Sequence, residues 1–140
     1  MKVFVDSDVV ISSLLSSDGA SRALLQQKGI HIFVSNHSVA EIRIVIDRLG
    51  IRPESFEELL EQTLSTVTLE DSLEEIRRSK NDYVYDIHDA HIVAGAVYSE
   101  ADFIATYNRK DYNHGRIKDD FGILICTPGQ LLQFLRSKQK

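Results

Sequence analysis

Acidic residues recur in this sequence where a strand-like segment ends or a helical segment begins. Asp6 ends the apolar run 2–5, Glu41 lies early in the helical segment 38–50, and Asp89 lies near the start of the helical segment 86–100. Carboxylates brought together from separate segments repel one another, so a cation or a proton must compensate them. Mg²⁺ and Mn²⁺ accept carboxylate oxygens together with substrate phosphate. These residues therefore suit phosphodiester cleavage by a metal-activated water.

Each acid also has a structural explanation, because acids are common at helix starts. Asp8 could cap the apolar helix that follows it. Glu41 could form a capping box with Ser38, and Asp86 could cap a helix in which Asp89 is the reciprocal acid. For a single acid the capping explanation is the better one, whereas recurrence at one edge of the predicted sheet favours a shared site.

Asp6 is the strongest single candidate for that site. If Asp8 caps the first helix, Asp6 has no capping role, and a buried carboxylate without a partner is costly. Other side chains would lie near the same edge and could complete the site as acids, amide ligands or hydrogen-bonding groups. These additional candidates are Asp8, Ser12, Thr106, Asn108 and Asp111.

The segments that position these residues alternate between two patterns. Short apolar runs rich in β-branched residues predict strands at 2–5, 31–35, 65–69, 102–106 and 122–127. Apolar residues spaced by three and four predict helices at 38–50, 53–64, 86–100 and 128–140. Strands without alternation that are separated by helices are typical of buried parallel sheets. We therefore predict a three-layer α/β/α sandwich with a central, mainly parallel sheet of about five strands.

Composition narrows the choice of protein class. A length of 140 residues suits one domain, and 43% hydrophobic with 26% charged residues is typical of globular proteins. No apolar run is long enough to span a bilayer, and no secretory signal pattern opens the sequence, so we expect no membrane association and a cytoplasmic location. A net charge of -5 argues against a protein that coats DNA.

Other chemistries are less well supported. His88 and His91 lack the i, i+4 spacing of helical zinc sites, and Cys126 has no partner, so we expect packing or surface roles for them. Glycine-rich phosphate loops and serine elbows are absent from the sequence. Four tyrosines near the acidic segments could stack on RNA bases or pack in the core, namely Tyr83, Tyr85, Tyr107 and Tyr112.

Four segments in order resemble PIN-domain proteins, and within them VapC-like toxins: "VDSDVVIS", "SVAEIRIVIDRLG", "DIHDAHIVAGAVYSEADFIATYNRKDY" and "GILICTPGQLLQFL". The resemblance covers nearly the whole chain and implies one PIN-like domain over residues 1–140. It implies an Mg²⁺- or Mn²⁺-dependent endoribonuclease with Asp6, Glu41 and Asp89 as its catalytic acids. Asp6 and Asp89 would bind the metal, and Glu41 would bind it directly or through water. An RNA substrate, an antitoxin protein and a homodimer are also implied.

Two positions depart from the family pattern. Asn108 stands two residues beyond Thr106, where many members have an aspartate, and Asp8 stands where a neutral polar residue is frequent. Because an amide brings no charge, the fourth acid must come from elsewhere or be absent. Asp111 is the nearest candidate, Asp119 and Asp120 are more distant ones, and Asp8 could restore the charge. The alternative is therefore a catalytically impaired PIN-like domain that binds RNA or a protein. A weaker alternative is a phosphatase or DNA nuclease that uses the same acids.

Overall fold

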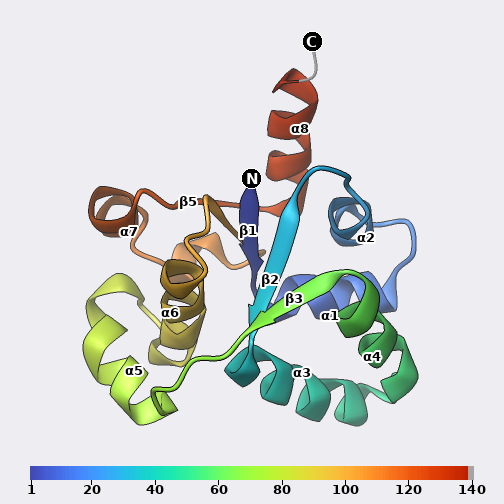
Figure 1. The fold of residues 1–140 in the computed structure, drawn as a ribbon, viewed down its shortest axis with the longest axis horizontal. Coiled ribbons are helices and arrows are strands. Elements are labelled where there is room, and N and C mark those ends of the chain that lie inside the picture. Colours follow the sequence, from blue (N-terminus) through green and yellow to red (C-terminus); the bar gives the residue numbers. More distant parts are fainter. Residues whose placement is uncertain (139–140) are drawn as a thin grey trace.

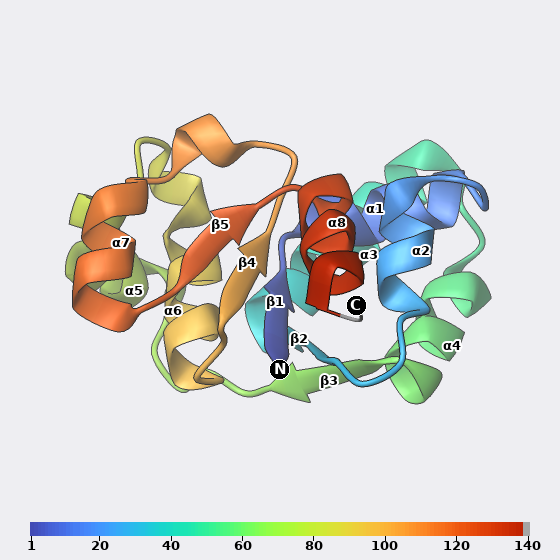
Figure 2. The same ribbon diagram turned by 90° about the horizontal axis from the view of Figure 1, so that it is seen from above.

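The computed structural model describes residues 1–138, which form a central sheet with helices on both faces (Figure 1, Figure 2). The strands are β1 (Lys2–Val5), β2 (His31–Ser35), β3 (Leu64–Val67), β4 (Phe103–Ala105) and β5 (Leu124–Cys126). The α-helices are α1 (Ser7–Leu15), α2 (Ala20–Leu25), α3 (Asn36–Leu49), α4 (Pro53–Gln62), α5 (Leu73–Lys80), α6 (Ala90–Tyr98), α7 (His114–Phe121) and α8 (Pro128–Lys138). Short 3₁₀ turns are η1 (Asn81–Tyr83), η2 (Ile87–Asp89) and η3 (Arg109–Asp111). The last two residues of the helix predicted at 128–140 lie outside the described residues.

All five strands are parallel, in the order β3-β2-β1-β4-β5. The central strand β1 pairs with β2 on one side and β4 on the other, with Val3 opposite both Ile32 and Phe103. The chain builds the sheet outward from β1 to β3 and then returns to build it outward through β4 and β5. Such a reversal of direction leaves a crevice at the carboxyl ends of the strands, where sites form in open parallel sheets. The predicted fold class is thus confirmed.

The sheet separates two layers of helices, each with its own apolar core. Helices α5, α6 and α7 cover one face and α1 to α4 with α8 cover the other (Figure 2). Along β1 the side chains of Val3 and Val5 enter one core, and that of Phe4 enters the other. A Cβ atom at position 95 would lie 2.3 Å from Cζ of Phe4, so Gly95 lets α6 lie directly on β1. This close packing positions the start of α6, which carries part of the acidic site.

The local signals explain most helix boundaries. Gly50 ends α3 with a left-handed φ of 71°, and Pro53 occupies the first turn of α4. Helix α5 begins with a capping box in which Ser72 and Glu75 bond each other's backbone, a signal that was present in the sequence. Within residues 1–138, no helix combines the length and the apolar character needed to cross a bilayer.

Candidate functional site

Asp6 is held at the carboxyl end of β1 by hydroxyl groups from the other end of the chain. Thr106 donates to its Oδ2 at 2.9 Å and Tyr112 donates to the same oxygen at 2.7 Å. Asp6 is 6% exposed and Tyr112 is 2% exposed. Because both hydroxyls bind Oδ2, they fix the carboxyl plane and leave Oδ1 without a side-chain donor among residues 1–138.

The ionisation of Asp6 reflects opposing effects. Burial raises its pKa, whereas the hydrogen bonds from Tyr112 and Thr106 lower it, and the nearby charge of Glu41 raises it. Burial and the Asp6 charge also raise the pKa of Tyr112, so its phenol stays neutral and keeps its donor proton. The phenol is therefore a permanent donor to a carboxylate that is costly to ionise.

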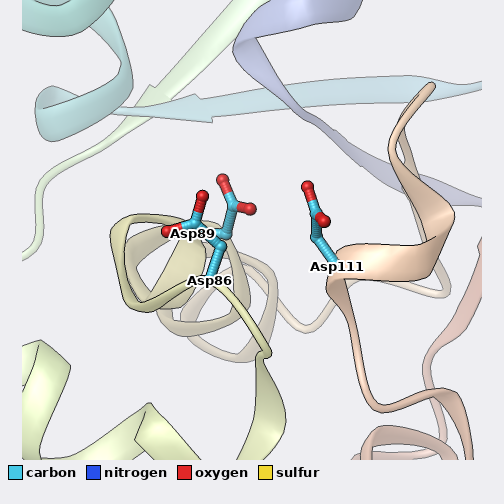
Figure 3. Close-up of side chains that lie close together, drawn as sticks. All are labelled: Asp86, Asp89 and Asp111. Carbon is cyan, nitrogen blue, oxygen red and sulfur yellow. The ribbon is translucent and has the colours of Figure 1, made fainter.

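A second group of carboxylates converges beside Asp6. Asp86, Asp89 and Asp111 each offer one oxygen, and these oxygens lie within 4.8 Å of one another. Figure 3 shows Asp86 and Asp89, from the N-cap and the end of η2, next to each other, and Asp111, from η3, on the other side of the space between the two segments. The two segments are joined by an antiparallel bridge between Val84 and Tyr112, so the fold itself holds the acids together.

The electrostatics of this group favour a bound cation. The pKa of Asp89 is raised to about 7 by burial first and then by the charges of Asp6, Asp86, Asp111 and Glu41. All of these donors are carboxylate oxygens, the ligand type that hard divalent ions prefer. A cation would relieve the repulsion, so these residues fit an Mg²⁺ or Mn²⁺ site.

Glu41 reaches the site from the first half of α3. Its Oε2 lies 3.4 Å from Nε2 of His91, which is 4% exposed at the start of α6, and this contact is the main reason that its pKa is lowered. The alternative that Glu41 forms a capping box with Ser38 is wrong, because α3 begins earlier. Ser35 is the N-cap, and its hydroxyl accepts from the N–H of Ser38. Glu41 is thus free to act in the site.

Asp8 does not cap α1, which corrects the capping role preferred from the sequence. The helix begins at Ser7, and Oδ2 of Asp8 instead accepts from the N–H of Tyr107 and from Nδ2 of Asn108, both at 3.1 Å. Burial and the charge of Asp6 raise the pKa of Asp8 to about 7. The two positions that were expected to depart from the family pattern are therefore hydrogen-bonded to each other.

The remaining candidates have mixed outcomes. Asp86 caps η2 by accepting from the N–H of His88, as one alternative predicted, yet it also joins the acid cluster. Asp89 makes no reciprocal capping bond. The hydroxyl of Ser12 makes no hydrogen bond within residues 1–138, whereas Thr106 binds Asp6.

The tyrosines near the site divide into two groups. Tyr112 is buried, so it cannot stack on a base, and its role as a donor to Asp6 was missed. Tyr85 and Tyr107 are 73% and 44% exposed and remain available for stacking. His91 was predicted to pack or lie on the surface; it is buried, and its contact with Glu41 was missed as well. The sequence offered no local signal for either contact, because the partners are far apart in the chain.

Comparisons with known proteins agree with this architecture. The family model described as PIN domain matches residues 2–110. A crystal structure of VapBC2 from Rickettsia felis, bound to a DNA fragment from their promoter, superposes with a TM-score of 0.63 and 14% sequence identity. The alignment covers 90% of this chain and 97% of that chain. A search of curated protein sequences finds no match. The chain shares its fold with the matched chain of the VapBC2 structure, and because the family model matches most of the sequence, the chain belongs to the PIN domain family.

Proposed function

We propose that this chain is an Mg²⁺- or Mn²⁺-dependent endoribonuclease and the toxin of a toxin–antitoxin pair. The observation that supports this proposal best is Asp6, fixed by two buried hydroxyls beside the convergent acids Asp86, Asp89 and Asp111. A purely structural role does not explain why a fold would keep this many carboxylates in mutual repulsion. Membership of the PIN domain family supports nuclease chemistry.

The burial and the contacts of each acidic side chain suggest its role in the proposed reaction. Oδ1 of Asp6 and the carboxylate of Asp89 would hold the cation, with Asp86 and Asp111 completing its acidic surroundings. When bound, such a cation lowers the pKa of water and offsets charge on the phosphate oxygens. Glu41 has a lowered pKa and a side chain that is 44% exposed, so it is ionised at neutral pH and can bind the cation or accept a proton from water.

The pair formed by Asp8 and Asn108 lies at the rim of the same site. The amide of Asn108 gives a hydrogen bond to Asp8, which brings a further carboxyl group next to Asp6. An aspartate at position 108 would instead add a further repelling charge next to Asp8. We infer that the amide is compatible with a working site.

A cleavage assay tests the nuclease directly. Purified protein is incubated with a labelled mixed RNA in Mg²⁺, in Mn²⁺ and in chelator, and single-stranded DNA and a phosphomonoester serve as alternative substrates. We expect metal-dependent cleavage of RNA that Asp6→Asn abolishes and that Asp18→Asn, a change at an exposed acid after α1, leaves intact. Failure of the folded, partner-free protein to cleave RNA with any divalent ion would favour the impaired RNA-binding or protein-binding module.

The toxin part of the proposal predicts partners. The likeness in fold to VapBC2 supports an antitoxin partner, and exposed apolar side chains on the helices, such as Leu15 and Leu49, support protein interfaces. We expect the isolated chain to form a homodimer and to act in the cytoplasm. Light scattering after gel filtration measures the mass, and a monomer at all concentrations would contradict the dimer. Cell fractionation tests the location.

A further inference from the structure

A cavity of about 360 Å³ opens beside the acidic site. One wall is the outer face of α3, from His37 through Glu41 to Arg48, and the opposite wall carries Leu73, Arg77, His88 and His91. Glu41 belongs both to this wall and to the group of acids that raise the pKa of Asp89. The cavity and the acidic site therefore share Glu41.

The rim of the cavity carries cations that the protein itself does not neutralise. Within residues 1–138, neither Arg48 nor Arg77 has a carboxylate within 4.0 Å, although the chain has an excess of acids. By contrast, the neighbouring Arg43 pairs with Glu57 at 2.6 Å. Two unpaired guanidinium groups facing one cavity favour an anionic ligand, because guanidinium binds phosphate oxygens with well-directed hydrogen bonds.

The walls between these cations are apolar and aromatic. Ile44 is 56% exposed on the α3 wall, and Leu73 faces it from α5. The ring of His37 is fixed by a hydrogen bond from Nε2 to the carbonyl of Asp71 at 2.9 Å. His91 is buried, and its Nδ1 has no hydrogen-bond partner in the described part of the chain. Flat rings and aliphatic side chains are the surfaces on which unpaired bases stack.

We propose that this cavity binds one nucleotide of the RNA strand, next to the phosphodiester held at the acidic site. Its base lies between Ile44, Leu73 and the accessible rings of His37 and His88, and its phosphate lies against Arg48 and Arg77. The volume is near the lower end of ligand cavities, about 300–1,000 Å³, which suits one nucleotide. The identity of the strand as RNA rests on the proposed function.

Binding in the absence of cleavage gives the first test. In the Asp6→Asn background, with chelator, a labelled single-stranded RNA of mixed sequence is titrated over a series of salt concentrations. We expect Arg48→Gln with Arg77→Gln to weaken binding by about tenfold. The slope of log K against log salt should fall by about 0.7 for each lost phosphate contact. Arg43→Gln with Arg52→Gln removes the same charge from ion-paired positions and should leave the slope unchanged.

A variant that fills the cavity tests whether RNA enters it, independently of the charge of the arginines. Ala40 is exposed on α3 and lines the cavity, so Ala40→Phe obstructs it without altering charge or the core. We expect weaker RNA binding with an unchanged salt slope, and parental affinity for Ala40→Ser. Circular dichroism of each variant confirms that it is folded.

The outcomes distinguish this proposal from the nuclease proposal. If the Arg48 and Arg77 variant binds RNA as the Arg43 and Arg52 variant does, the cavity does not hold a nucleotide, whatever the wild-type protein cleaves. If the variant instead loses binding only to a labelled acidic peptide, the cavity is a protein site and the proposal is overturned. Loss of RNA binding without any cleavage by the wild type would support the cavity and refute the nuclease.

Discussion

Replacing Tyr112 by phenylalanine is the most direct way to test how Asp6 is prepared for metal binding. The change removes one hydroxyl and keeps the buried ring, so the packing around position 112 is preserved. Asp6 loses the shorter of the two hydrogen bonds to Oδ2, which is 2.7 Å long, and retains the bond from Thr106. The carboxyl group can then rotate about a single remaining side-chain contact.

The expected magnitude follows from the burial of the pair. A hydrogen bond to a charged group contributes about 1.5–3 kcal/mol. Tyr112 is the strongest of the groups that lower the pKa of Asp6, so without it the pKa rises further and Asp6 can take up a proton. Protonation limits the loss, and we therefore expect the free energy of unfolding to fall by about 1.5 kcal/mol at neutral pH. Metal affinity should fall by about 10-fold or more, as for other groups that orient ligands.

Tyr83 provides a matched control for this change. Its hydroxyl also donates to a carboxylate, Oδ2 of Asp120, at 2.7 Å, but this pair is exposed and lies outside the acidic site. Urea unfolding and titration with Mn²⁺, followed by the paramagnetic resonance of the free ion, measure both effects. Tyr83→Phe should change neither by more than a small amount. Equal Mn²⁺ affinities for Tyr112→Phe, Tyr83→Phe and the parent would refute the idea that Tyr112 orients Asp6.

Further expectations concern charge and packing. The pKa of Asp89 in the folded protein, about 7, is higher than its ordinary value, so between these two values the native state binds a proton that the unfolded state does not. Melting temperatures measured in chelator should therefore fall as the pH rises from about 4 to 8. Added Mg²⁺ should reverse this fall, because it binds the ionised acids of the native state. Asn108→Asp should lower the free energy of unfolding, and adding Asp8→Asn should recover it, with a coupling of about 0.5–3 kcal/mol in urea unfolding. Gly95→Ala should cost about 1–3 kcal/mol in the same assay, since the new methyl meets Phe4.

Each of these expectations has a contradicting result. Melting temperatures that rise over the same pH range in chelator would show that the acids are not in mutual repulsion. If Asn108→Asp and Asp8→Asn change the free energy of unfolding additively, the hydrogen bond between positions 8 and 108 does not contribute to stability. Gly115→Ala is the control for α6, because a methyl at Gly115 in α7 meets nothing within 4 Å; equal costs for the two glycines would contradict the close packing of α6 on β1.

The inner strands β1 and β4 could be predicted from the sequence because each is an apolar run that is buried almost throughout, whereas the edge strands β3 and β5 are partly exposed. Helices α5 and α7 could not be predicted, because each carries only one pair of apolar side chains in its span, Leu73 with Ile76 and Ile117 with Phe121. One pair sets no repeat of three and four, so the hydrophobic pattern gave no signal. Helix α2, with only six residues, is likewise too short to show a period. These three helices form where the sheet offers an apolar face for them to cover, which their own sequences do not show.

The capping alternatives for Glu41 and Asp8 failed for a related reason, whereas that for Asp86 was confirmed. Serine and an acid three residues later is a frequent helix start, yet α3 begins ahead of Ser38, and α1 begins ahead of Asp8. The N-cap is the residue whose backbone is still extended just before the helix begins. When several polar residues stand in a row, the sequence pattern does not show which of them has this backbone conformation. Once the helices start earlier, Glu41 and Asp8 have side chains free for other contacts.

The contacts that prepare the site span almost the full chain, and this is why the sequence did not show them. Asp6 and Tyr112 are 106 positions apart, and Asp8 and Asn108 are 100 apart, yet parallel pairing of β1 with β4 brings both pairs together. The amide at position 108, which looks in the sequence like a lost acid, is the donor that allows a second carboxyl group to lie beside Asp6. The unexpected amide at position 108 is thus in contact with the unexpected acid at position 8. The number of acids in the site therefore depends on Asp8 and Asn108 together, and neither position alone gives it.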